Sequence, residues 1–288
     1  MKIIDCHTHL GKDIFYEKHD MGDFDGIPPE QYADDLLDKL NNFNIDKALS
    51  FPFPSPLGQY DEDDFWYQKE NSDIVSCNSE CKLKTVPAFN PKDKESIRYA
   101  DKLVRENNLK AFKVHTRTTK YEPTYLIPKA KEIIKSNDVP LILHIGSGKE
   151  EDLRKENIDD TLSSAIQLAK NNQNLRFTFA HLGRLHEDIR EALALENVMM
   201  DTAALSLKDN WEGFIAEKYC EDFIEKTPKE IINSLLDEGY DEDIIWGSDD
   251  PFNLSYCEEL NYVKENDCIS KKEKNKLMYK NAKKWFDL

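Results

Sequence analysis

The sequence contains no long apolar run and has few basic residues relative to acidic ones. None of its 288 residues lies in a stretch approaching the ~20 apolar residues of a membrane-spanning helix. The N-terminal apolar run is only Ile3-Ile4, which is too short for the core of a signal peptide. With 39 Lys and Arg against 56 Asp and Glu, the net charge is −17, whereas nucleic-acid binding needs clustered cations. We therefore expect a cytoplasmic protein with neither a membrane nor a nucleic acid as partner.

Paired cysteines and linker segments are also missing. The six cysteines are scattered, and only Cys77 and Cys81 lie close together, without the second pair that a zinc knuckle requires. We expect reduced thiols. The chain has no internal repeat, low-complexity tract or Pro/Gly/Ser-rich linker, so we predict one domain over residues 1–288. The length suits a single α/β barrel, and a hydrophobic fraction of 39% suffices for a sizeable core.

Short β-branched or apolar runs alternate with longer, helix-patterned segments along the whole chain. The expected strands are Lys2–Asp5, Lys47–Phe51, Lys84–Phe89, Ala111–His115, Pro140–His144, Arg176–His181, Val198–Thr202 and Ile244–Ser248. The expected helices are Pro29–Asn42, Ser96–Asn107, Pro128–Ser136, Thr161–Asn171, Glu187–Leu195 and Pro228–Glu238. This order predicts an α/β fold, a (β/α)8 TIM barrel. A doubly wound sheet is the alternative, but His-Thr-His stands where its Gly-rich phosphate loop would be.

Two irregular segments distort the regular alternation. They are Pro52–Asp64, with three prolines, and Asp201–Thr227, which must contain an insertion after the seventh strand. Both follow the C-terminal ends of expected strands. Since active sites of such barrels lie at that end, both segments are expected beside the site.

The motif Asp5-Cys6-His7-Thr8-His9 is the strongest local signal for chemistry. Side chains at positions i and i+2 of a strand share a face, so His7 and His9 are expected to face the barrel interior together. Neutral imidazoles are common zinc ligands, and two from one strand can hold one ion. The alternative is a pair of buried, hydrogen-bonded histidines.

Further histidines and one acid stand at the ends of expected strands. Of the seven histidines, His115, His144 and His181 join His7 and His9 in such positions, and five at one rim are hard to explain as core filler. Asp249 follows the last strand, which adjoins the first strand in a barrel. A carboxylate there can bind an ion and accept a proton from a bound water.

Taken in chain order, these residues resemble the amidohydrolase superfamily, and more closely its amidohydrolase-2 branch. The resemblance spans the chain, and the closing segment Asn281-Ala-Lys-Lys-Trp-Phe286 is similar to the C-terminus of that branch. It implies a distorted barrel with its active site at the C-terminal ends of the strands, and a metal-dependent hydrolase. The implied ligands of one divalent cation are His7, His9, His144 and Asp249, and the implied catalytic residues are Asp249 and His181.

The resemblance leaves the kind and number of metal ions open. Three histidines and one aspartate suit zinc, and manganese or iron also fits. In superfamily members with two ions, a lysine on the fourth strand is carboxylated and bridges them, and Lys113 has the matching position. The amidohydrolase-2 branch resembles a one-metal site, so we favour one ion and place Lys113 near the substrate.

Several other polar residues of the rim suit substrate binding. Arg117 and Arg184 can bind a substrate carboxylate bidentately, with local salt bridges as the alternative. The expected substrate-binding residues are Lys113, His115, Arg117 and Arg184. Among their neighbours, Asp5 shares the predicted inward parity of His7 and can accept a hydrogen bond from a ligand imidazole, whereas Cys6 is expected to face outward. Asp201 is expected to support the site, and Asp250 is expected to cap a loop.

Two reactions are compatible with this site. The first is hydrolysis of an amide, lactone or ester bond of a small molecule, with Asp249 taking the proton of the attacking water. The alternative is non-oxidative decarboxylation of a small unsaturated or aromatic carboxylic acid. A binding barrel without catalysis would have lost ligands, and none of the expected ones is missing. A homo-oligomer is compatible with the sequence, which carries no signal for assembly.

Overall fold

The computed structural model describes residues 1–12, 30–53, 66–78, 82–116, 119, 121–124, 126, 128–145, 162–208, 219–253 and 255–288. Arg117, residues 54–64 of the first irregular segment and residues 209–218 of the second lie outside the described residues. The parallel strands among them are β1 (Ile4–Lys12), β3 (Lys47–Pro52), β4 (Leu83–Thr85), β5 (Phe112–His115), β6 (Leu141–His144), β7 (Phe177–Phe179), β8 (Val198–Asp201) and β9 (Ile244–Ile245). Each expected strand corresponds to one of these. A further short strand, β2 (Glu30–Gln31), runs antiparallel to the end of β1.

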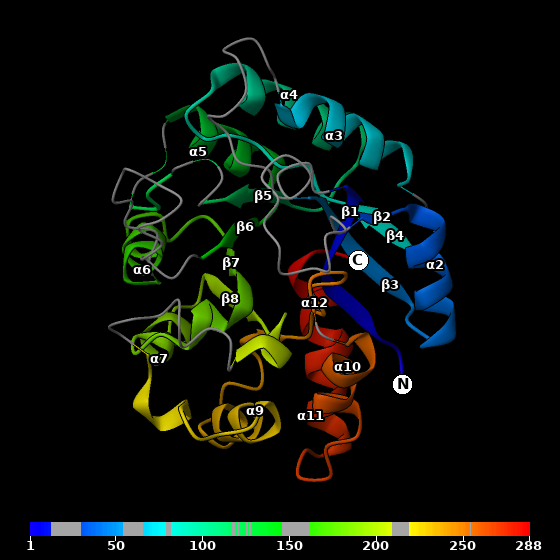
Figure 1. Cartoon of the computed structure of the whole chain (residues 1–288). Coiled ribbons are helices and arrows are strands. Elements are labelled where there is room, and N and C mark those ends of the chain that lie inside the picture. The colour runs from blue at the N-terminus through cyan, green and yellow to red at the C-terminus, as the bar shows by residue number, and fades with distance from the viewer. Residues whose placement is uncertain are drawn as a thin grey trace, which may run out of the picture.

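The strands follow one another in the order of a barrel, but the hydrogen-bonded ladder is interrupted twice. One sheet has the order β2-β1-β3-β4 and the other β5-β6-β7-β8-β9. Isolated bridges span both seams, Ala88 with Lys113 and Thr8 with Asp250. The result is a distorted barrel that continuous strand pairing does not close (Figure 1).

Helices surround the strands, as Figure 1 shows. They are α2 (Ala33–Asn42), α3 (Trp66–Ser76), α4 (Lys94–Asn107), α5 (Pro128–Asn137), α6 (Leu162–Asn171), α7 (Ile189–Leu193), α9 (Pro228–Asp237), α10 (Tyr256–Lys264), α11 (Lys271–Asn275) and α12 (Asn281–Trp285). Shorter helical turns are η1 (Ala180–Leu185), η2 (Leu205–Leu207), η3 (Glu221–Phe223) and η4 (Lys276–Lys280). No helix in the described part of the chain is long and apolar enough to cross a membrane.

Local sequence signals account for the helix boundaries. Thr227 caps α9 by accepting the backbone N–H of Glu230, whose side chain returns a bond to the Thr227 N–H, and Pro228 occupies the first turn. Asp93 caps α4 by accepting the backbone N–H of Glu95. Helix α2 begins later than predicted, at Ala33, because Glu30–Gln31 pairs with β1 instead of extending the helix.

The barrel interior is filled by a cluster to which most of the strands contribute. It includes Ile4, Cys6, Leu49, Phe51, Val86, Ala111, Ile142, Met199 and Ile245. Ala282 and Phe286 join this cluster, so the C-terminal segment packs where the strands begin. Strands β5 and β6 are buried along their whole length, as expected for parallel strands covered on both faces.

A β-bulge in β1 decides which side chains of the motif face inward. Asp5 pairs with Ala48 and Thr8 with Ser50, so β1 advances three residues where β3 advances two. The extra residue inverts the alternation of side chains. Cys6 therefore belongs to the interior cluster, and the prediction that it faces outward is wrong. The five described cysteines, Cys6, Cys77, Cys220, Cys257 and Cys268, are free, as expected for reduced thiols.

Candidate metal centre

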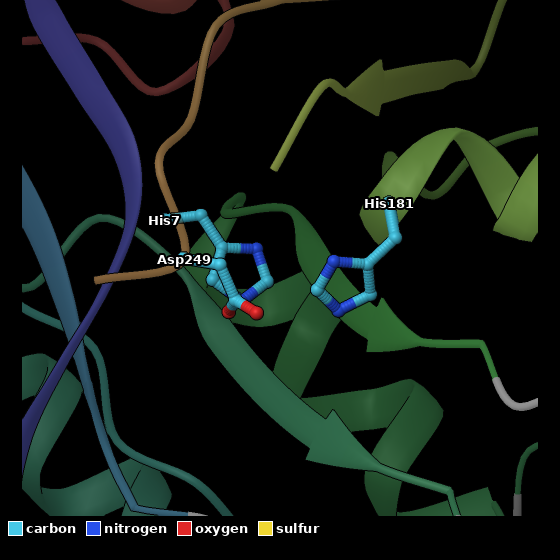
Figure 2. A group of neighbouring side chains, drawn as sticks. All are labelled: His7, His181 and Asp249. Atoms are coloured by element: carbon cyan, nitrogen blue, oxygen red, sulfur yellow. The ribbon is translucent and has the colours of Figure 1, made fainter. Parts of the chain in front are cut away.

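Two imidazoles of β1 converge on one carboxylate that follows β9. The Nε2 atoms of His7 and His9 lie 3.1 and 3.2 Å from the same oxygen of Asp249, Oδ1. All three side chains are buried. Figure 2 shows the His7 ring and the Asp249 carboxylate side by side, with His181 facing them from the opposite side. The sequence prediction that these ends of β1 and β9 meet is thus reproduced in space.

The remaining ring nitrogens of these histidines are already engaged. His7 Nδ1 lies 2.9 Å from Asp201 Oδ2, and His9 Nδ1 lies 3.3 Å from the carbonyl oxygen of Pro52. An oxygen acceptor at Nδ1 holds the proton there, which leaves the lone pair on Nε2. Two nitrogen lone pairs would then face a carboxylate oxygen, an arrangement that a cation satisfies. His7 Nε2 is accordingly a buried nitrogen without a hydrogen-bond partner among the described residues.

Burial and charge favour the metal-binding forms of His9 and Asp249, whereas they raise the pKa of His7. Burial lowers the pKa of His9 to about 4, so the ring is neutral at pH 7. Burial also opposes ionisation of Asp249, but the His181 and His7 rings outweigh it and hold the pKa of this carboxyl well below its usual value. For His7, burial and Lys113 lower the pKa, and the carboxylates of Asp201 and Asp249 reverse this to a net increase. A carboxylate and a neutral imidazole are the forms that bind a metal.

His181 and His144 form a second, hydrogen-bonded pair beside this cluster. His181 Nε2 lies 3.0 Å from His144 Nδ1, and His181 Nδ1 lies 3.1 Å from the carbonyl oxygen of Ala203. Burial lowers the pKa of His181 to about 3 and that of His144 well below its usual value. Ligand atoms of His7, His181 and Asp249 all lie within 4.8 Å of one another. Neither His9 nor His144 is in that group, and the His144 ring is stacked on His115 at 3.9 Å.

A left-handed turn directs His181 toward the site. The expected strand Arg176–His181 ends at Phe179, and residues 181 to 185 all have positive φ, near 59° for His181 and 58° for Arg184. Side-chain sterics disfavour this conformation by about 1–2 kcal/mol for each non-glycine residue. Asp201 compensates in part, because its Oδ1 accepts the backbone N–H of His181 at 2.8 Å. Strained backbone of this kind is concentrated at functional sites.

The predicted substrate-binding cations lie beside the cluster where the structure describes them. Lys113 is 2% exposed, and its Nζ lies 4.4 Å from the centre of the Phe51 ring. Within the described residues this ammonium makes no hydrogen bond. Burial lowers the pKa of Lys113 to about 8, against the opposing charges of Asp201 and Asp249. Arg184 is near enough to lower the pKa of both His144 and His181.

Two acids next to the cluster differ from their predicted roles. Asp5 points away from the imidazoles, since the bulge reverses its parity, and it binds the Tyr256 hydroxyl and two backbone N–H groups instead. Burial raises its pKa to about 7. Asp250 forms an ion pair with Lys39 at 2.8 Å. Asp201 supports the site as expected, through His7 and the backbone of His181.

Three aromatic rings surround His9 that the sequence did not predict as site residues. Phe51, Phe53 and Phe252 approach the His9 ring at 5.6, 5.9 and 5.0 Å between ring centres. Phe51 also meets the edge of His7 at 4.9 Å. Such an apolar surround lowers the local dielectric and strengthens the electrostatic interactions of the ligands. In the sequence, Phe51 and Phe53 stand near the end of β3 and just beyond it, and Phe252 follows β9, but no pattern marks them as neighbours of His9.

The barrel and the cluster at the C-terminal ends of its strands define an α/β barrel with a candidate metal centre. The profile of a family described as Amidohydrolase matches residues 4–288. The chain therefore belongs to the amidohydrolase-2 family of metal-dependent enzymes that act on small molecules. Among curated proteins no sequence matches it.

Solved structures share the fold over the full chain. An amidohydrolase from Burkholderia multivorans with bound zinc is 13% identical with a TM-score of 0.68, and the match covers 100% of both chains. A probable 2-pyrone-4,6-dicarboxylic acid hydrolase from Acinetobacter baumannii, with citric acid bound, is 12% identical with a TM-score of 0.63 and the same coverage. The 5-carboxyvanillate decarboxylase from Sphingomonas paucimobilis is 11% identical with a TM-score of 0.62, over 100% of this chain and 99% of that one. These matches confirm the predicted barrel fold.

Proposed function

We propose that the chain is a hydrolase that activates a water for attack on an amide, lactone or ester bond of a small molecule. The observation that carries this proposal is the convergence of the Nε2 atoms of His7 and His9 on one oxygen of Asp249. With the proton on Nδ1 of each ring, both nitrogens would direct their lone pair at the carboxylate, and the His7 nitrogen has no hydrogen-bond partner in the described structure. These donors fit a divalent cation.

His7, His9 and Asp249 would hold this cation, with a fourth ligand from the His144–His181 pair. The family resemblance assigns that place to His144, whereas the distances favour His181. We propose a single zinc ion, which three imidazoles and a carboxylate suit, although manganese or iron can occupy the same donors. Measuring metal affinity in His144→Ala and His181→Ala separates the two candidates. The true ligand is the one whose loss weakens binding more.

Bound at this site, the cation supplies Lewis acidity and lowers the pKa of water toward neutrality. Asp249 is ionised at neutral pH because its pKa is depressed, so it can accept the proton of the attacking water. The same carboxyl then returns the proton to the leaving group. His181 is neutral, faces Asp249 across the site, and orients the water or polarises the substrate (Figure 2).

Lys113 favours a substrate that carries negative charge. Its ammonium is buried and lacks a hydrogen bond within the described residues. A buried charge without a partner is costly, and a substrate carboxylate would satisfy it. We assign Arg184 to the same task, with Arg117 and His115 as further substrate contacts. Both the hydrolase from Acinetobacter baumannii and the decarboxylase from Sphingomonas paucimobilis have substrates named as carboxylic acids.

The buried ammonium of Lys113 also supports one competing reaction, decarboxylation of a small unsaturated or aromatic acid. There the substrate would lose its carboxylate as carbon dioxide, and no water would attack. Turnover in ¹⁸O-labelled water distinguishes the two. Hydrolysis transfers the label into the product, whereas decarboxylation releases carbon dioxide and leaves the remaining product unlabelled.

The cytoplasmic location expected from the sequence stays a prediction.

Asp249→Asn tests the proposed role of this acid directly. We expect turnover on a panel of carboxylic esters, lactones and amides to fall by on the order of 10²–10⁴, the usual contribution of general acid–base catalysis. Asp243→Asn is the control, because Asp243 is a half-buried acid just before β9, at the other end of the same strand. Equal turnover in Asp249→Asn and in the wild type, with both proteins folded by circular dichroism, would refute the assignment.

A further inference from the structure

The junction between β1 and β9 is held by a side chain where ladder hydrogen bonds are missing. Regular backbone bonds join Cys6 N–H to the Trp246 carbonyl at 3.1 Å and Asp249 N–H to the His7 carbonyl at 2.8 Å. The N–H groups of His7 and Ser248 instead both donate to Asp5 Oδ1, at 3.1 and 3.0 Å. One carboxylate oxygen thus binds the backbone of His7 and of the residue that precedes Asp249.

The second oxygen of Asp5 connects this junction to a helix outside the barrel. The Tyr256 hydroxyl donates to Asp5 Oδ2 at 2.8 Å. Tyr256 is the first residue of α10 and is buried, with its ring 5.0 Å from that of Phe43 and 6.1 Å from that of Trp246. Because both rings hold Tyr256 in place, its hydroxyl fixes the direction of the Asp5 carboxylate.

The two segments that Asp5 joins approach each other closely. A Cβ atom added to Gly247 would lie only 2.8 Å from His7 Cβ, so the glycine is required there for space. Asp249 itself has a φ of 64°, a left-handed conformation that its surroundings must stabilise. A small movement of either segment therefore changes the distance between His7 Nε2 and Asp249 Oδ1.

We propose that Asp5, together with Tyr256, is the positioning residue of this site. Asp5 contacts no imidazole and acts through the backbone, by holding the first histidine and the last carboxylate of the cluster at metal-binding distance. Helix α10 thereby becomes part of the support of the site. This inference rests on the proposed metal centre.

Cobalt(II) titration of the metal-free protein, followed by visible absorption, tests the proposal without any substrate. Asp5→Ala removes both acceptor oxygens, and we expect cobalt affinity to fall on the order of 10–100-fold, with a changed absorption spectrum, as for other residues that orient ligands. Asp5→Asn retains an oxygen for the two N–H groups and should restore both affinity and spectrum nearly to the wild type. Tyr256→Phe keeps the ring but loses the hydroxyl, so its affinity should lie between those of Asp5→Ala and the wild type.

Asp46→Ala is the matched control. Asp46 Oδ2 accepts the N–H of Ile3 at 2.7 Å, next to the opposite end of β1, so its loss should leave the cobalt spectrum unchanged. Wild-type affinity and spectrum in both Asp5→Ala and Tyr256→Phe would overturn the positioning role. If Asp5→Ala fails to fold, Tyr256→Phe alone decides. Cobalt binding that is absent from the wild type, or unaffected by His7→Ala, would instead overturn the metal centre and the inference with it.

Discussion

Replacing Asp201 by asparagine should weaken metal binding although Asp201 is not itself expected to touch the ion. The carboxylate is fully buried and accepts three hydrogen bonds. Oδ2 faces His7 Nδ1 at 2.9 Å, while Oδ1 accepts the N–H groups of His181 at 2.8 Å and Ala203 at 3.2 Å. Although burial opposes ionisation, His7 and the His181 ring and backbone N–H together outweigh it, so that the pKa of Asp201 is lowered and the group is charged at neutral pH.

The geometry indicates the size of the effect. In Asp201→Asn, the amide oxygen can keep the two backbone donors only if the NH₂ group faces His7 Nδ1. That contact requires an unprotonated Nδ1, so the proton moves to Nε2 and occupies the lone pair intended for the metal. For His7 to bind the metal, its proton must return to Nδ1, where it faces the asparagine NH₂ group and lacks an acceptor. Leaving this buried donor unsatisfied costs about 1–3 kcal/mol of binding free energy. This corresponds to a loss of about 5- to 150-fold in metal affinity.

Competition between the protein and a chelator for zinc at neutral pH measures this affinity. Asp243→Asn serves again as the control, and thermal unfolding of the metal-free proteins shows whether the fold is intact. Zinc affinity in Asp201→Asn equal to that of the wild type would mean that the His7 tautomer does not depend on Asp201, contrary to this prediction.

Two further predictions concern spacing and pH. Gly247→Ala places a Cβ 2.8 Å from His7 Cβ, so we expect a loss of about 1–3 kcal/mol in stability together with weaker zinc binding. Gly239 has a φ of 96°, and a Cβ added there would meet no other side chain or backbone within 4 Å. Chemical denaturation of Gly239→Ala should therefore show lower stability while zinc affinity is retained. Burial raises the pKa of Glu259 to about 8, against hydrogen bonds from Ser206. The folded state then keeps a proton that the unfolded chain releases near 4.5, so the free energy of unfolding falls as pH rises from about 4.5 to 8. Urea denaturation across this range should show a smaller fall in Glu259→Gln, and an identical pH dependence in both proteins would contradict this prediction.

The sequence predicts those parts of the site that depend on strand order alone. Parallel strands end at one rim, so the histidines within β1 and those that close β5 and β6 are brought together whatever the details of pairing. The β1 motif also predicts correctly that His7 and His9 face the same side. It does so although the bulge inverts the alternation before them, since both histidines lie beyond the point of inversion.

The remaining features depend on single residues of local geometry or on distant partners. One extra residue in β1 turns Asp5 outward and Cys6 inward, and nothing in an alternating pattern marks such a bulge. Asp5 meets Tyr256 from a position 251 residues away in the chain. The left-handed turn that carries His181 contradicts the preference of its own residues, because burial of Leu182 and Leu185 and the Asp201 hydrogen bond override local propensity.

Anomalous diffraction from crystals grown with zinc, recorded at the zinc absorption edge, tests the metal centre most directly. We expect a single strong peak at ~2.0–2.2 Å from His7 Nε2, His9 Nε2 and a carboxylate oxygen of Asp249. A peak bound by other residues, or no peak at these three, would contradict it.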